Sequence, residues 1–175
     1  AYWAAGVRHI VALRGDPPDG AGGRYEPHAE GYGYAADLVA GARAIAPFEI
    51  SVAVYAHRHP DSETWRVELD NFKRKIDAGA TRGISNFFVD AESFLRLRDR
   101  CADWGITVPI VPGIMPVSNF NGFRKMAAVG GVPVPDWFAD MFDGLDGDPE
   151  TRMLVAAATT GELCARLAAE GVEDF

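Results

Sequence analysis

Four short apolar segments alternate along the chain with longer segments in which apolar residues recur at helical spacing. The apolar segments are rich in Val, Ile and Phe, which is typical of strands buried on both faces of a sheet. The sequence therefore predicts strands at His9–Leu13, Glu49–Tyr55, Gly83–Val89 and Thr107–Ile114.

Helical periodicity occupies the stretches between these strands. One helix is expected from Ala35 to Ala46, ahead of Pro47. Two further helices are expected to end at Gly79 and Gly105, where glycine favours a helix terminus. Their apolar stripes are Trp65, Leu69, Phe72 and Ile76 in the first, and Phe94, Leu97, Cys101 and Trp104 in the second.

A last helix is marked by its first residues. Asp148 is suited to the cap, Pro149 to the first turn and Glu150 to the positive end of the helix dipole. This helix is expected to end before Gly171 and to pack closely through a slim face. That face is predicted to consist of Leu154, Ala157, Ala158, Ala165 and Ala168.

The alternation of strands and helices predicts an α/β fold with a parallel sheet and right-handed crossovers. An open doubly wound sheet and a TIM (β/α)8 barrel both satisfy this pattern. Polar residues follow the strand ends, and the loop after Asp16 is long and rich in Gly and Pro, which favours the barrel. A full barrel needs about 250 residues. At 175 residues this chain is therefore expected to be three or four βα units short of a complete barrel. Its sheet would then have two bare edges and would expose half of a barrel interior.

Composition and charge narrow the class of protein. The net charge of -8 argues against a nucleic-acid partner, which requires a basic surface. No apolar run approaches the roughly 20 residues that cross a bilayer, and the first residues lack a signal-peptide pattern, so a cytoplasmic protein without a membrane partner is expected. Cys101 and Cys164 fall within helical patterns and are predicted to be buried thiols.

Candidate chemistry lies after the strand ends. His57 and His59 alternate in an extended segment and should point to opposite sides, so no metal site is predicted. Glu68, Asn71 and Lys75 form a polar stripe at i, i+3 and i+7. The stripe either solvates a helix edge or lines a ligand, in which case Lys75 offers positive charge to a phosphate.

Several longer stretches carry a family resemblance: "HIVALRGD", "YAADLV", "ISVAVYAHRHP", "NFKRKIDAGATRGISNFFVD", "FLRLRDRC", "PGIMPVSNF" and "MFDGLDGDPETR". In this order they resemble the flavin-dependent 5,10-methylenetetrahydrofolate reductase family. The resemblance implies a TIM barrel with FAD at its carboxyl face, of which this chain covers roughly the fourth to seventh βα units. Residues 1–175 would thus be a partial catalytic barrel domain, with the N-terminal strands and the last strand outside this sequence. It also implies hydride transfer from NADH or NADPH to FAD and then to methylenetetrahydrofolate, giving 5-methyltetrahydrofolate.

The resemblance assigns cofactor-binding roles residue by residue. Asp16 is implied to contact the flavin and to face the folate, where a carboxylate would favour the cationic iminium form that accepts the hydride. The family usually has aspartate where Glu68 stands. The full set of implied cofactor-binding residues is Arg14, Gly15, Asp16, Tyr34, Ala35, Tyr55, His59, Ser62, Glu68, Asn71, Arg74 and Lys75.

The implied folate subsite departs from the family at three positions. Asn86 stands where the family usually has glutamine, Gly122 replaces a second glutamine, and Met126 replaces a phenylalanine. The family's general-acid glutamate and its folate-binding arginine correspond to regions outside this sequence. Three functions therefore stay open: a reductase, a flavin- or folate-binding member without reductase activity or with a shifted substrate, and a barrel for another one-carbon carrier. The resemblance also implies a homo-oligomer.

Overall fold

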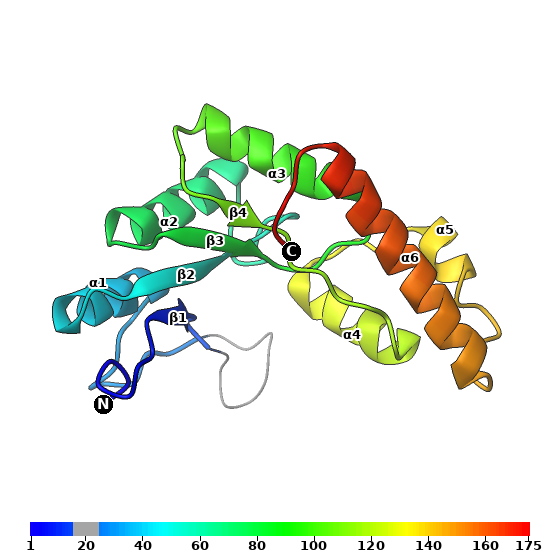
Figure 1. Ribbon diagram of the computed structural model, residues 1–175, viewed down its shortest axis with the longest axis horizontal. Coiled ribbons are helices and arrows are strands. Elements are labelled where there is room, and N and C mark those ends of the chain that lie inside the picture. The colour runs from blue at the N-terminus through cyan, green and yellow to red at the C-terminus, as the bar shows by residue number, and fades with distance from the viewer. Residues whose placement is uncertain (16–24) are drawn as a thin grey trace.

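The computed structural model describes residues 1–15 and 25–175. Within these ranges the strands are β1 (His9–Ala12), β2 (Glu49–Val54), β3 (Arg82–Ser85) and β4 (Ile110–Val111). The helices are α1 (Ala35–Ile45), α2 (Trp65–Asp77), α3 (Ala91–Asp103), α4 (Phe120–Gly130), α5 (Asp136–Asp140) and α6 (Pro149–Ala169). Figure 1 shows the strands side by side, with α2 and α3 along the convex side of the sheet.

The strand order separates the two candidate architectures. All neighbouring strands are parallel, and their spatial order β1-β2-β3-β4 follows their order in the chain. A doubly wound sheet reverses its order at a switch point, whereas a barrel adds each strand beside the last. The sheet is therefore built as successive βα units of a barrel, as predicted.

The main core lies between one face of the sheet and the first three helices. Alternate residues of β2 point to this face because side chains alternate along a strand, and Ile50, Val52 and Val54 are fully buried. The helices contribute the buried residues Val39 and Ala42 from α1, Leu69 and Phe72 from α2, and Phe94, Leu97 and Cys101 from α3.

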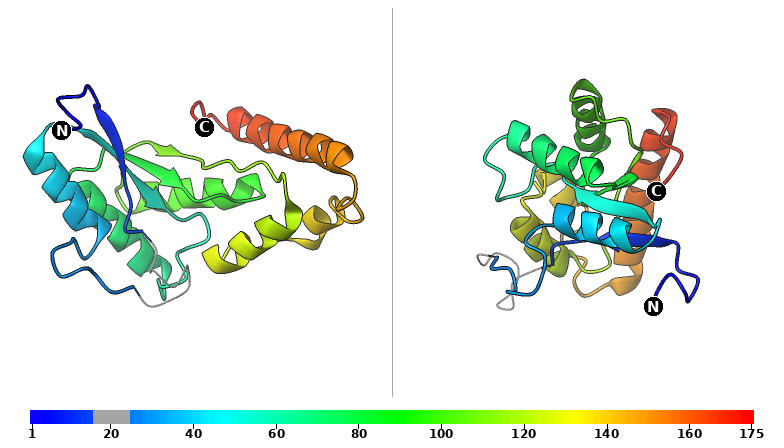
Figure 2. Two further views of the ribbon diagram at one scale, coloured as in Figure 1. Left: turned by 90° about the horizontal axis from the view of Figure 1, so that it is seen from below. Right: turned by 90° about the vertical axis from the view of Figure 1, so that its left-hand side faces the viewer.

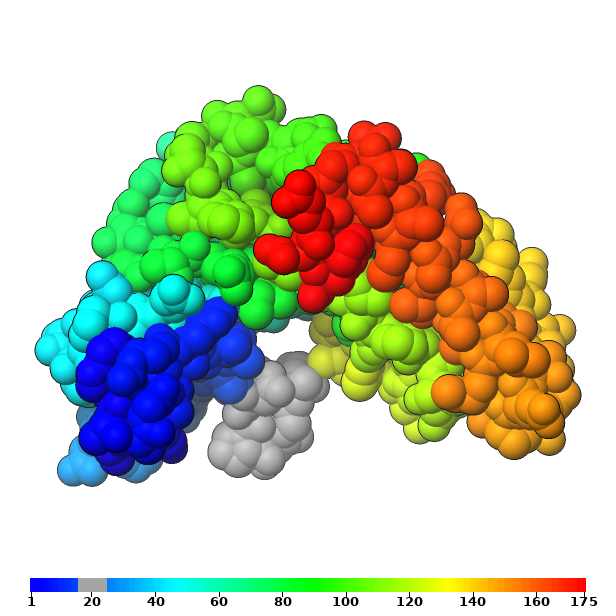
Figure 3. Space-filling model, viewed as in Figure 1, coloured from blue at the N-terminus to red at the C-terminus, as the bar shows by residue number. Residues whose placement is uncertain are grey.

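The other face of the sheet is open at β1. The side chains of Val11 and Leu13 are 54% and 55% exposed, although parallel strands are normally covered on both faces. Figure 3 shows the molecule as an arch, with the N-terminal region in one leg and α4 to α6 in the other. The expected bare interior face is thus present in the described residues.

A second core lies under α4 and α5, two helices that the sequence analysis did not predict. Phe120 of α4 stacks on Phe142 with ring centroids 5.0 Å apart, and Phe123 packs against Phe138 at 5.7 Å. Asn119 caps α4 by accepting the Gly122 N–H, as an asparagine at this position commonly does. The aromatic cluster explains why this segment is helical and not an extended loop after β4.

The last two strands are shorter than predicted. β3 ends at Ser85 and not at Val89, because Phe88 and Val89 leave the sheet and are buried among side chains. β4 comprises only Ile110 and Val111. It lies between Pro109 and Pro112, and proline has no N–H with which to extend a ladder.

The last helix begins as predicted but buries a different face. Asp148 caps α6 by accepting the Thr151 N–H, and Pro149 occupies the first turn. The predicted face of Leu154, Ala157, Ala158, Ala165 and Ala168 is exposed, with Leu154 66% accessible. The buried residues are instead Ala156 and Leu167. The faces of an alanine-rich helix differ little in hydrophobicity, so the sequence does not indicate which face is buried. The packing of α6 beside α3 decides this instead (Figure 2).

The two cysteines differ in burial. Cys101 is buried in the core, and that burial raises the pKa of its thiol to about 12, with the Glu68 carboxylate adding to the effect. Cys164 is only partly buried, so the prediction of two buried thiols holds for Cys101 alone. None of the helices among the described residues is long and apolar enough to cross a membrane.

Candidate cofactor site

The carboxyl ends of the four strands lie at one edge of the sheet, since all four are parallel. Residues that the sequence analysis assigned to a cofactor follow β1 and β2, lie at the start of α1, and extend along α2 from Glu68 in its first turn to Arg74 and Lys75 in its last. Of the residues assigned to folate, Asn86 follows β3, and Gly122 and Met126 lie on α4. Asp16, which was assigned to both ligands, falls outside the described residues.

Arg14 is held in place at the end of β1 by two contacts. Its guanidinium carbon lies 4.7 Å from the ring centroid of Tyr25, and its Nη1 lies 3.5 Å from Oδ2 of Asp61. Gly15 follows with a φ of +81°, a left-handed conformation that favours glycine. The cation therefore has a defined position, with an aromatic ring on one side and a carboxylate on another.

A small pocket adjoins Arg14 and reaches the beginning of α1. Its volume is about 220 Å³, below the roughly 300–1,000 Å³ of sites that enclose a whole drug-sized ligand. Tyr34, the N-cap residue of α1, lines it, and Ala35 follows as the first helical residue. The sequence analysis did not assign Tyr25, His28 or Tyr32, although a cluster of aromatic and histidine residues between glycines was a visible signal. The lining residues are Leu13, Arg14, Tyr25, His28, Gly31, Tyr32, Tyr34 and Leu38.

The loop between β2 and α2 presents Tyr55 and His59. Their rings pack edge to face with centroids 4.7 Å apart and an interplanar angle of 84°. Nδ1 of His59 accepts the backbone N–H of Asp61 at 3.0 Å. In a neutral imidazole the proton then resides on Nε2, so this atom can donate a hydrogen bond to a ligand.

The polar stripe of α2 divides into an inner and an outer pair. Glu68 and Lys75 point inward: Glu68 is buried, and Nζ of Lys75 donates to the carbonyl oxygen of Ala53 at 2.6 Å. Burial lowers the pKa of Lys75, whereas the Glu68 carboxylate opposes that change. Asn71 and Arg74 form the outer pair, in which the Arg74 guanidinium donates to Oδ1 of Asn71.

The three residues assigned to folate do not form one polar surface. Oδ1 of Asn86 accepts the backbone N–H of Ala56 at 2.8 Å. This hydrogen bond connects the segment that follows β3 with the segment that follows β2. Gly122 lies in the first turn of α4. Met126 lies one turn further along α4 with its side chain exposed. Their spacing of four residues puts Gly122 and Met126 on one face of that helix.

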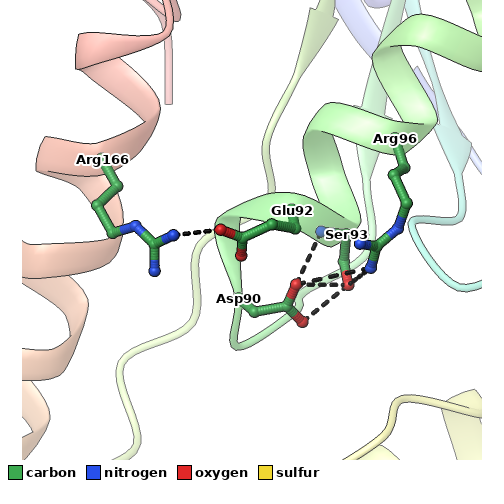
Figure 4. A network of polar contacts seen from close by, with 5 residues as sticks. All are labelled: Asp90, Glu92, Ser93, Arg96 and Arg166. Carbon is green, nitrogen blue, oxygen red and sulfur yellow. Dashed lines mark hydrogen bonds and ion pairs between the residues drawn. The ribbon is translucent and has the colours of Figure 1, made fainter.

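His57 has surroundings that differ from those of His59. Its Nε2 atom is buried without a hydrogen-bond partner among the described residues. The charges of Asp90 and Arg96 act on its imidazole, and both residues belong to the polar network at the start of α3 (Figure 4). In that network Oδ1 of Asp90 caps α3 by accepting the backbone N–H of Ser93 at 2.8 Å. His57 and His59 were predicted to point to opposite sides of the segment, and their side chains do have different neighbours.

His57 is expected to make the stability of the protein depend on pH. Burial lowers the pKa of its imidazole, and the Arg96 guanidinium contributes, whereas the Asp90 carboxylate opposes this shift. Below about pH 6.5 the unfolded chain therefore binds a proton that the folded chain resists. The free energy of unfolding should be unaffected by this group above that pH and fall as the pH decreases.

Urea unfolding between pH 7.5 and 5.5 measures this effect. The His57→Gln variant should show a flatter dependence of the unfolding free energy on pH than the parent protein. His28→Gln, which changes an exposed histidine, is the matched control and should keep the parent slope. If the unfolding free energy depends on pH equally in the parent protein and in His57→Gln, His57 is not the source of the pH dependence.

The fold defines a class: a domain built of successive βα units of a barrel, in which the carboxyl ends of the strands are the usual place for a ligand site. The Methylenetetrahydrofolate reductase family profile matches residues 1–175. The chain belongs to the methylenetetrahydrofolate reductase family, and its four βα units are therefore part of a TIM barrel.

Individual relatives agree with this assignment. The chain is 51% identical over 174 residues to 5,10-methylenetetrahydrofolate reductase of Escherichia coli (strain K12) and to that of Pectobacterium carotovorum subsp. carotovorum. Each match covers 99% of this chain and 56% of the relative, so the chain spans little more than half the length of these proteins. It is 34% identical over 179 residues to Methylenetetrahydrofolate reductase (NADH) 1 of Zea mays, covering 96% of this chain and 30% of that protein.

A solved structure supports the fold independently. An uncharacterized protein from Clostridium thermocellum, described as binding two copies of 5-methyl-5,6,7,8-tetrahydrofolic acid, matches with a TM-score of 0.55 at 16% identity. The match covers 95% of this chain and 63% of that one. At this level of identity the likeness concerns the course of the backbone.

Proposed function

We propose that the intact protein carrying this chain is a methylenetetrahydrofolate reductase. It would transfer a hydride from NADH or NADPH to FAD and then to 5,10-methylenetetrahydrofolate, giving 5-methyltetrahydrofolate. Family membership supports this proposal. The observation that carries it is the gathering of Arg14, Tyr34, Tyr55 and His59 at the carboxyl edge of one sheet.

The residues present fit a cofactor that has flat rings and a negatively charged linker. Arg14 and Arg74 supply cations, the tyrosines of the pocket supply apolar ring surfaces, and His59 supplies an N–H donor. Lys75 would add a third cation once its amine turns from the Ala53 carbonyl. FAD, when bound, supplies a two-electron carrier that accepts and returns a hydride. The protein's contribution is to orient donor and acceptor in turn and to keep water away.

The folate would lie beside the flavin, near Asp16, Asn86, Gly122 and Met126. Because Oδ1 of Asn86 is engaged by the Ala56 N–H, a pterin would be bound through the amide nitrogen. The Asp16 carboxylate would stabilise the cationic form of the substrate. Met126 offers an exposed apolar surface in place of the family's aromatic ring.

A second candidate function is a flavin- or folate-binding member without reductase activity or with a shifted substrate. Two observations favour it: the engaged amide oxygen of Asn86, and the absence of a side chain at Gly122. A barrel that handles another one-carbon carrier is a third possibility, and the same two positions would decide it. All three share the flavin site.

The absorption spectrum of the purified intact protein tests these functions. A reductase should show flavin bands that bleach on adding NADH or NADPH and return on adding methylenetetrahydrofolate. Bands that bleach but do not return would support the second candidate and direct attention to Asn86 and Gly122. A colourless protein that takes up no added FAD would refute the flavin assignment altogether.

The remaining proposals concern the setting of the enzyme. We propose a cytoplasmic homo-oligomer that acts on a small folate and has no nucleic-acid or membrane partner. The net charge of -8 supports the first of these exclusions, because nucleic-acid surfaces are polyanionic. Size-exclusion chromatography with light scattering measures the number of subunits.

A further inference from the structure

Arg152, a partly buried residue near the start of α6, connects two loops that are far apart in the sequence. Its Nε donates to the carbonyl oxygen of Ser118 at 2.9 Å. Its Nη1 donates to the carbonyl oxygens of Leu145 at 2.9 Å and Asp146 at 3.1 Å. Ser118 lies in the loop that leads from β4 to α4, whereas Leu145 and Asp146 lie between α5 and α6. One side chain therefore fixes the approach to α4 against the approach to α6.

The connected residues belong to two of the stretches that carry the family resemblance. Ser118 is part of "PGIMPVSNF", and Arg152 is the last residue of "MFDGLDGDPETR". The first stretch leads directly into the helix that bears two of the residues assigned to folate, whereas no residue of the second was assigned to a ligand. The hydrogen bond from Arg152 to Ser118 indicates that the second stretch supports the first.

A guanidinium is well suited to hold two loops together. It has five N–H donors in a rigid planar fork and keeps its charge at any ordinary pH, so it can bind several carbonyl oxygens at once. Hydrogen bonds from a charged donor are also stronger than those between neutral groups. The ammonium group of a lysine could not reproduce this planar arrangement.

A second contact ties the same loop to α4. Nδ2 of Asn121, in the first turn of α4, donates to the carboxylate of Asp146, with both oxygens 3.3 Å away. Asp146 is thus held through its carbonyl oxygen by Arg152 and through its side chain by Asn121. Gly122 is the next residue along α4, and Met126 lies one turn further on. The placement of these two residues therefore depends on the loop before α6.

We propose that Arg152 is a positioning residue for the folate substrate and acts by fixing the start of α4 against the loop before α6. Its Nε and Nη1 atoms are engaged by backbone carbonyl oxygens, so this role requires no contact between Arg152 and the ligand. The role rests on the proposed function, because it takes methylenetetrahydrofolate as the substrate that binds beside α4.

Steady-state kinetics of the intact protein test the role of Arg152. Arg152→Met removes the guanidinium and keeps an unbranched side chain. The KM for methylenetetrahydrofolate should increase about tenfold, because the hydrogen bonds that hold the start of α4 are lost. The value of kcat and the dissociation constant of FAD should change by less than about twofold, since the loss concerns the placement of one substrate. Arg152→Lys keeps the charge and should raise KM only about threefold.

Amide hydrogen exchange of the same variants gives a readout that does not depend on catalysis. The backbone N–H groups of residues 117–123 should exchange at least about fivefold faster in Arg152→Met than in the parent protein, because the start of α4 opens more often. The N–H groups of β2 should keep the parent rate.

Arg166→Met is the matched control. Arg166 lies on the same helix, roughly 20 Å further along, and pairs with Glu92 of α3 (Figure 4). This exposed ion pair contributes little, so the variant should keep the parent KM and the parent exchange rate of residues 117–123.

Several results would overturn the role of Arg152. They are an unchanged KM in Arg152→Met, an unchanged exchange rate of residues 117–123, and equal losses of folate and FAD affinity, which would indicate a purely structural role. If Arg152→Met does not fold, the KM of Arg152→Lys decides the question. A parent protein that reduces no methylenetetrahydrofolate would refute the proposed function itself. If the parent protein is active and KM does not change, only the role of Arg152 fails.

Discussion

Replacing Arg14 with alanine is expected to weaken FAD binding by about 100-fold, which corresponds to about 2.7 kcal/mol. The guanidinium lies at the carboxyl end of β1, between the Tyr25 ring and the Asp61 carboxylate, and it lines the pocket at the start of α1. Its loss removes a positioned cation and one wall of that pocket. Fluorescence titration of the apoprotein with FAD measures the effect.

Arg8 is the matched control for this prediction. It lies just before the same strand, at the opposite end, and its guanidinium also covers an aromatic ring, with the carbon 4.1 Å from the Trp3 centroid. Arg8→Ala should change FAD affinity by less than about twofold, because solvent-exposed charges far from a ligand contribute little. Similar losses in the two variants would show that net charge, and not the position of Arg14, governs binding.

Gly113→Ala is expected to reduce the free energy of unfolding by more than about 3 kcal/mol. A Cβ at this position would lie 2.1 Å from the carbonyl oxygen of Ser85, a backbone atom that cannot rotate away. The Gly113 N–H also donates to Oγ of Ser85 at 2.9 Å, so movement would break this link between β3 and the end of β4. Urea unfolding followed by circular dichroism measures the loss.

Gly161→Ala is the control in the opposite direction. Gly161 lies within α6, and apart from the adjoining backbone of its own helix an added Cβ would meet nothing within 4 Å. Alanine has a higher helix propensity there and restricts the unfolded chain, so the variant should gain about 1 kcal/mol. A Gly113→Ala variant as stable as the parent would mean that the strands after β3 approach each other less closely than described.

Local sequence signals predicted most of the elements and part of the site. Helices α1, α2 and α3 appear where apolar spacing and terminal Gly or Pro residues put them. The polar residues after the strand ends predicted a site at the carboxyl edge of the sheet, and that location stays a prediction. The aromatic pocket was missed, since Tyr25, His28 and Tyr32 lie in a glycine-containing loop without periodicity. Helix α4 was missed because its glycines obscured an apolar stripe formed by Phe120, Phe123 and Ala127.

By itself the sequence determined the βα alternation, the caps of the last helix, the family and the residue types available for a cofactor. These properties depend on residues that are adjacent in the sequence or on sequence motifs, and both can be recognised without a structure. The tertiary structure decided which face of α6 is buried and which way each polar side chain of α2 turns. Glu68 and Lys75 turn inward because buried partners from the loop and from β2 satisfy them. The carbonyl that binds Lys75 belongs to another element, and the donors to Glu68 belong to the irregular loop before α2, so helical spacing does not predict either contact.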